Sequence, residues 1–228
     1  MADAFGKMLL DGTVLEIIER DDGFVDAAKI GYFAPVARWP AVERRALRWV
    51  RGRVLDACVG AGRAALELQQ RGRSVVAIDV SPGALEVARG RGVRDVRLLA
   101  FEELDDSVGQ FDTIVMFGNN FGLFGSPSKA RRLLRRLRPL ADRIVAGSNN
   151  PYATEDPAHL AYQEHNRNRG RMPGQLRLRN RYRDLIGPWF DYLIVSPDEM
   201  ATILEGTGWR IRRLLEERGS GYYVAILE

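Results

Sequence analysis

The sequence predicts an α/β protein built on a doubly wound, mostly parallel seven-stranded sheet with an antiparallel C-terminal hairpin strand. Three observations lead to this prediction. Short apolar runs alternate with helical segments between residues 53 and 147. A glycine turn, containing Gly60 and Gly62, directly follows the first of these runs. The last two apolar runs are separated only by residues 218–221, and so short a connection requires antiparallel strands.

Residues 1–50 are expected to form a helical N-terminal cap. Its first part is interpreted as an amphipathic segment with an apolar side made of Leu9, Val14, Leu15, Ile17 and Ile18. Pro40 then predicts the start of a helix that runs to about Val50.

The alternation that begins at residue 53 predicts the order of the central elements. Strands are expected at 54–57, 74–79, 96–99, 111–117 and 144–147, with helices at 64–70, 82–90 and 128–137. Residues 74–79 are apolar apart from their ends, which is typical of a strand buried on both faces. Ser81 and Pro82 mark a helix start, because serine caps free N–H groups and proline suits the first turn.

The C-terminal part is expected to contain a helix from Ser196 to near Gly206, followed by strands at 209–217 and 222–227. Before it, residues 148–196 form an insertion with a helix or loop near 159–168. Two strands at 175–184 and 189–195 then predict a β-hairpin flap over the substrate. On the first of them, apolar side chains alternate with Arg177, Arg179, Arg181 and Arg183; these arginines face water or an anionic substrate, and water is favoured. We expect residues 1–228 to form one domain.

The composition restricts the class of protein. The chain has 228 residues, a net charge of +4 and 46% hydrophobic residues, as an ordinary globular protein has. Its single cysteine excludes an internal disulfide and fits a reducing compartment. Because no signal peptide or long apolar segment is visible, we expect a cytoplasmic protein without a membrane span. The arginines are dispersed, so nucleic acid is not expected as a partner.

Two carboxylates follow the first two predicted strands. Asp56 lies at the end of a buried strand, where a carboxylate needs a cation or hydrogen-bond donors, or else caps the following turn. Asp79 ends the second strand, where an acid can accept both hydroxyls of a ribose, or cap the next helix. Together with Gly60 and Gly62, these acids predict a nucleoside-binding crevice at the carboxyl edge of the sheet.

This pattern resembles the class I S-adenosyl-L-methionine (SAM)-dependent methyltransferases from about residue 54 to residue 227. The antiparallel last strand is part of the resemblance, since a plain dinucleotide-binding sheet has a sixth parallel strand instead. Where the family often has glycine, this chain has Cys58, which narrows the conformational freedom of the turn. The resemblance implies SAM as cofactor, S-adenosyl-L-homocysteine as its product, no metal, and a cofactor site made of Asp56, Cys58, Gly60, Gly62, Asp79, Val80, Phe101, Glu102, Gly118 and Asn119.

In this family methyl transfer is an in-line displacement without a universal catalytic residue, so the resemblance assigns none here. His159 and His165, the two histidines, are candidates for a base, and Asn119 and Asn120 for holding a polar acceptor. No Asn-Pro-Pro-Tyr or Asp-Pro-Pro-Tyr segment follows the fourth strand, so a small-molecule acceptor is favoured over a nucleic-acid base.

Two other functions stay open at this point. One is an NAD(P)-dependent oxidoreductase on the same half-sheet, and the other is a non-catalytic scaffold or regulator. The protein is expected to be a monomer or a homodimer, since exposed aromatic residues of the flap would pack on the substrate or on a second subunit; these are Trp189, Phe190 and Tyr192.

Overall fold

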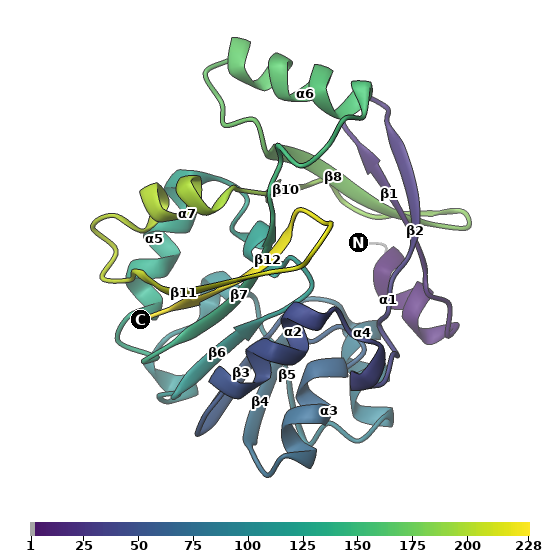
Figure 1. Cartoon of the computed structure of the whole chain (residues 1–228). Coiled ribbons are helices and arrows are strands. Elements are labelled where there is room, and N and C mark those ends of the chain that lie inside the picture. Colours follow the sequence, from purple (N-terminus) through teal and green to yellow (C-terminus); the bar gives the residue numbers. More distant parts are fainter. Residues whose placement is uncertain (1–2) are drawn as a thin grey trace.

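The computed structural model describes residues 3–228 and contains two sheets (Figure 1). The larger has seven strands in the order β11-β12-β7-β6-β3-β4-β5. β12 runs antiparallel to both of its neighbours, whereas the pairs from β7 to β5 are parallel, which confirms the predicted fold class. The bounds are β3 Arg53–Ala57, β4 Ser74–Asp79, β5 Asp95–Leu98, β6 Thr113–Met116, β7 Ile144–Asn149, β11 Ile211–Glu216 and β12 Tyr222–Leu227.

Helices cover both faces of this sheet, because its strands are apolar on both sides. In β3, Val54 packs into one core cluster and the next residue, Leu55, into the other. The first cluster includes residues of α2 (Ala41–Ala46), α3 (Arg63–Gln70) and α4 (Pro82–Gly90), and the second includes residues of α5 (Pro127–Leu137) and α7 (Pro197–Leu204). Ser81 caps α4 by accepting from the N–H of Ala84, as predicted. Short 3₁₀ turns are Val36–Arg38, Leu47–Trp49, Phe101–Glu103, Asp106–Val108 and Asn120–Phe124 (η1 to η5).

The second sheet is antiparallel and has five strands, in the order β10-β8-β1-β2 with β9 paired to β8. It joins the predicted flap to the N-terminal segment, and Figure 1 shows it together with α6 over the carboxyl ends of the parallel strands. The bounds are α1 Ala4–Leu10, β1 Leu15–Arg20, β2 Val25–Lys29, α6 Pro157–Asn168, β8 Gln175–Tyr182, β9 Leu185–Ile186 and β10 Phe190–Leu193.

The expectation of a helical cap over residues 1–50 is wrong between residues 15 and 29. That segment is a β-hairpin, turned at Gly23 with φ +87°, and β1 completes its pairing on β8. Pairing with β1 supplies hydrogen-bond partners for the backbone N–H and C=O groups along one edge of β8. In a free two-stranded flap these groups would face water.

The flap aromatics also differ from the expectation, since Trp189, Phe190 and Tyr192 are half-buried rather than exposed. Trp189 lies under the guanidinium of Arg179 at 4.4 Å, and Tyr192 packs toward the large sheet. Within residues 3–228, no helix is long and apolar enough to cross a bilayer.

Candidate cofactor and acceptor site

The turn after β3 is left-handed at three positions. Cys58, Gly60 and Gly62 have φ values of +70°, +52° and +82°. Cys58 therefore keeps the backbone shape that favours glycine, at a cost of about 1–2 kcal/mol for a residue with a Cβ. A Cβ on Gly62 would stand 2.7 Å from Val93, so this glycine is required by packing.

Gly60 differs from Gly62 because space lies above it. A Cβ there would meet only ring atoms of Tyr32 at 3.8 Å and Phe5 at 3.9 Å, which are ordinary contact distances. Those two rings pack edge to face with centroids 5.5 Å apart. A methyl group would therefore fit at Gly60, in contact with aromatic side chains of the N-terminal segment.

Asp56 is the buried acid at the end of β3. It is 4% exposed, and its Oδ2 has no hydrogen-bond partner among the residues that the structure describes. Burial raises the pKa of Asp56 to about 7, while the backbone N–H of Ala65 and the charge of Arg63 act in the opposite direction. Because Oδ2 has no donor among the described residues, capping of the turn does not account for this carboxylate, and the orphaned oxygen suits a cation.

Asp79 holds the turn to the end of β4. Its Oδ2 accepts the N–H of Gly60 at 2.9 Å and its Oδ1 accepts the N–H of Ser81 at 3.0 Å. Burial raises the pKa of Asp79, although these two N–H groups act in the opposite direction. The capping side chain of α4 is Ser81, so Asp79 keeps lone pairs for another partner.

Apolar side chains line the ends of β4 and β5 beside Asp79. Val80 is 68% exposed and Leu98, the register partner of Asp79, is 61% exposed. Phe101 follows β5, is half-buried, and packs edge to face on Phe124 at 5.3 Å. Glu102 is exposed and forms an ion pair with Lys129. Phe101 and Glu102, which the resemblance assigns to adenine, therefore follow the end of β5, the strand next to Asp79.

The loop after β6 is held rigidly by its own hydrogen bonds. Gly118 donates its N–H to Oε1 of Glu43 at 3.0 Å. Asn119 has φ +68°; its Oδ1 accepts from Asn149 N–H at 2.9 Å, and its carbonyl accepts from the Tyr192 hydroxyl at 2.6 Å. The Asn120 amide reaches the carbonyl of Cys58 at 3.3 Å. Both asparagines thus connect the loop to its neighbours.

Two charged residues at this site were missed by the sequence analysis. Glu43 of α2 is 1% exposed, accepts from the Tyr222 hydroxyl at 2.7 Å, and pairs with Arg63 at 2.9 Å. Arg63 also lies 4.6 Å over the ring of Trp39. The position of Arg63 directly after Gly62 was a usable signal, whereas nothing in the sequence of α2 distinguishes Glu43 from a surface acid.

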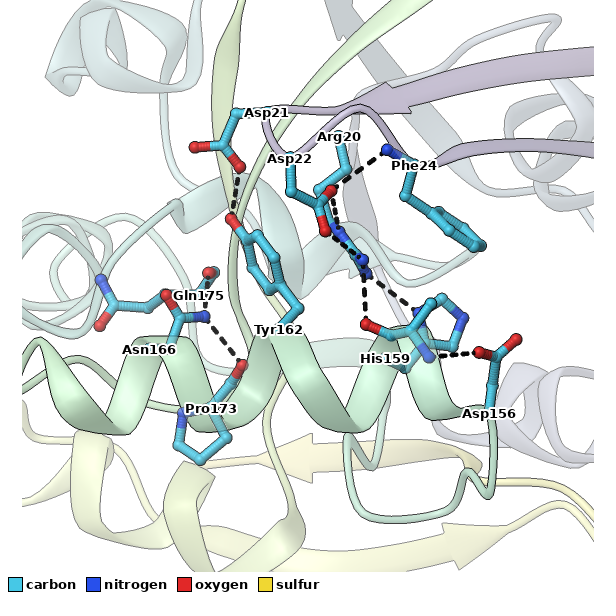
Figure 2. Close-up of polar contacts among 11 residues, drawn as sticks. Arg20, Asp21, Asp22, Phe24, Asp156, His159, Tyr162, Asn166, Pro173 and Gln175 are labelled. Atoms are coloured by element: carbon cyan, nitrogen blue, oxygen red, sulfur yellow. Dashed lines mark hydrogen bonds and ion pairs between the residues drawn. The ribbon is translucent and has the colours of Figure 1, made fainter.

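Both histidines belong to α6, and Figure 2 shows the surroundings of His159. His159 Nδ1 is 3.0 Å from Arg20 Nη1, and its ring packs edge to face on Phe24 at 4.9 Å. Arg20 is buried and donates two hydrogen bonds to the carboxylate of Asp22. Its guanidinium lies 4.2 Å from the centroid of the Tyr162 ring. His159 is therefore part of the packing of α6 on β1. His165 is exposed, with Nε2 3.2 Å from Nη1 of Arg169 on the same helix.

The arginines of β8, and Arg183 directly after it, are paired with acids. Arg179 and Arg181 both contact Glu19 of β1, Arg177 lies 3.5 Å from Asp191, and Arg183 lies 3.2 Å from Asp11. Their charge is therefore offset locally by these acids.

Comparison with known proteins gives matches that agree with this geometry. A family model described as "Methyltransferase domain" matches residues 54–140. A SAM-dependent methyltransferase from Bacteroides fragilis, solved with S-adenosyl-L-homocysteine, is 26% identical with a TM-score of 0.83, over 100% of this chain and 94% of that one. The CcbJ methyltransferase from Streptomyces caelestis shares the fold at 17% identity and a TM-score of 0.66, over 99% and 97% of the two chains.

A curated relative matches a shorter segment. Magnesium-protoporphyrin O-methyltransferase from Rhodobacter capsulatus is 39% identical over 67 residues, which are 28% of this chain and 30% of that protein. The match thus spans less than a third of the length of the relative.

Proposed function

We propose that this chain, which belongs to the class I SAM-dependent methyltransferases, transfers a methyl group from SAM to a small-molecule acceptor. The observation that carries the choice of acceptor is the second sheet. It lies over the carboxyl edge and contacts the loop after β6 through the Tyr192 hydroxyl (Figure 1). A site covered in this way favours an acceptor that fits beneath the sheet over a polymer.

The residues at the turn after β3 fit SAM. Its ammonium and sulfonium groups are cations, and the orphaned Oδ2 of buried Asp56 is an acceptor in need of one. A pyrophosphate would instead be repelled by this carboxylate, which argues against a nicotinamide dinucleotide. The family membership argues in the same direction.

The ribose and the adenine fit the end of β4. Asp79 uses one lone pair on each oxygen for a backbone N–H, which leaves acceptor capacity for two hydroxyls. Val80, Leu98 and Phe101 offer apolar surface for a purine beside it.

When bound, SAM supplies a methyl group that is already activated on sulfur. The protein then has to align the acceptor with that methyl group and exclude water, and orientation alone contributes roughly 7–11 kcal/mol in well-aligned reactions. Glu43 fixes the N–H of Gly118, and Tyr192 fixes the carbonyl of Asn119, so the loop after β6 would need little rearrangement when cofactor and acceptor bind.

Two observations support a small acceptor further. The arginines of β8 are paired with acids, so they form no free basic surface for a nucleic acid. The name of the curated relative also specifies a small molecule, magnesium-protoporphyrin.

The proposal is tested by offering methyl-labelled SAM and the purified protein to three fractions of a cell extract: low-mass metabolites, protein and nucleic acid. We expect label to enter the low-mass fraction only. Label that enters protein or nucleic acid would contradict the small-molecule assignment while leaving methyl transfer in place.

A further inference from the structure

Glu16 lies on the face of the second sheet that is turned toward the carboxyl edge of the large sheet. Strand register places Ile18 opposite Asn180, and Leu176 opposite Tyr192. Side chains two residues apart on a strand share a face, so Glu16, Asn180 and Tyr192 lie on the same side of the sheet. Oε1 of Glu16 accepts from the Asn180 amide at 3.0 Å, which orients the carboxylate.

This face is the one that points at the glycine turn. Tyr192 donates to the carbonyl of Asn119, and its ring would lie 2.3 Å from a Cβ on Gly122. At the other end, Tyr182 packs in one cluster with Ala61, a residue of the turn itself. The arginines and Glu19 occupy the opposite face, where they pair with one another.

Tyr32 and Tyr192 lie close enough to Glu16 for its charge to raise their pKa values. The ring of Tyr32, a neighbour of Glu16, stands 3.8 Å from the Cβ position of Gly60. Burial raises the pKa of Glu16, while Tyr32 and Asn180 act in the opposite direction. Arg20, on the same face of β1 as Glu16, is already paired with Asp22, and Arg63 is paired with Glu43 and stacked on Trp39. Glu16 thus presents a largely buried carboxyl group on the face of the second sheet that is turned toward the glycine turn.

We propose that Glu16 is the proton-accepting residue of the acceptor subsite and that the acceptor is a small amine. A protonated amine suits a space bounded by a carboxylate and tyrosine rings, because both attract cations. The carboxylate of Glu16 would repel an anionic acceptor. This inference rests on the proposed function, since it places Glu16 opposite the methyl group of SAM.

With an amine acceptor, the reaction transfers one proton to Glu16 and one methyl group to nitrogen. The alkylammonium gives one proton to the Glu16 carboxylate, and the freed nitrogen lone pair forms the new N–C bond. The C–S bond breaks with its electron pair kept by sulfur, which yields the neutral thioether of S-adenosyl-L-homocysteine. The product leaves as a methylated ammonium, and Glu16 returns its proton to water.

The test uses two matched probes, phenethylamine and phenylacetate, and measures their binding by calorimetry at neutral pH to protein saturated with S-adenosyl-L-homocysteine. We expect the amine to bind at least about tenfold more tightly than the carboxylate, the size of one charge-assisted hydrogen bond. In Glu16→Gln this preference should fall to within about threefold, while affinity for S-adenosyl-L-homocysteine is unchanged.

Glu19→Gln is the matched control, because it removes the same charge three residues away on the opposite face of β1. It should retain the preference of the native protein. Equal binding of the probes, binding of neither, or the same loss of preference in both variants would overturn the role of Glu16. Failure to bind S-adenosyl-L-homocysteine at all would instead count against the proposed function.

Discussion

Asp56 provides a prediction that links cofactor binding to stability. Burial raises the pKa of Asp56 to about 7 in the folded protein, whereas in the unfolded chain it stays near the ordinary value of 3.8. The folded protein therefore binds a proton that the unfolded chain releases between these values, and its stability falls as pH rises from about 4 to about 7. The full difference in the pKa of Asp56 between the folded and unfolded states corresponds to roughly 4 kcal/mol in the free energy of unfolding.

The perturbation is Asp56→Asn, which removes the titrating group at nearly constant volume. The amide has its own fixed cost, because Oδ2 becomes a donor without a partner, but that cost does not change with pH. The informative quantity is therefore the change in relative stability with pH. Between pH 5 and pH 8.5 the native protein should lose roughly 2–3 kcal/mol relative to Asp56→Asn.

The assay is urea unfolding of both proteins at the two pH values, followed by circular dichroism. Asp184→Asn serves as a control, since Asp184 is exposed and its loss should leave the pH profile of the native protein intact. Bound S-adenosyl-L-homocysteine should reduce the loss of stability, because its ammonium favours the charged form of Asp56. Parallel pH profiles for the native protein and Asp56→Asn would refute this reasoning.

Three further predictions concern the turn and the ribose. Cys58→Val should lower the free energy of unfolding in urea by on the order of 1–2 kcal/mol, because a β-branched residue tolerates φ +70° poorly. Cys58→Gly should stay within about 1 kcal/mol of the native protein. Equal effects of the two substitutions would contradict backbone strain at Cys58. Gly62→Ala should lower the free energy of unfolding by about 1–3 kcal/mol through its clash with Val93. Gly60→Ala should fold but bind S-adenosyl-L-homocysteine more weakly in calorimetry. Native affinity in Gly60→Ala would mean that the cofactor binds elsewhere. Asp79→Ala should weaken that affinity about tenfold or more, and unchanged affinity would remove the ribose assignment.

The large sheet could be predicted from sequence because its signals are local. Buried parallel strands are continuous apolar runs, and Ser81 caps α4 through an interaction three residues long. The left-handed turn could also be located, since Gly60 and Gly62 follow the first strand directly. The shape that Cys58 adopts could not, because only the neighbouring packing holds a residue with a Cβ in that conformation.

The N-terminal hairpin was missed because its partner lies far along the chain. β1 pairs with β8, about 160 residues away, and this long-range pairing outweighs the helical spacing of Leu9, Val14 and Ile18. The β-branched pair Ile17 and Ile18 before the turn at Gly23 was an available signal for a strand. Glu16, which that strand carries into the site, could not be singled out before its pairing was known.

The central claim is that the turn from Cys58 to Gly62 holds SAM, and calorimetric titration tests it most directly. Native protein is titrated with S-adenosyl-L-homocysteine, with NADH and NADPH as parallel ligands and Gly60→Ala as the folded control. We predict micromolar binding of S-adenosyl-L-homocysteine, weakened in Gly60→Ala, and no binding of either nicotinamide. Binding of a nicotinamide, or of none of the three ligands, would contradict the claim.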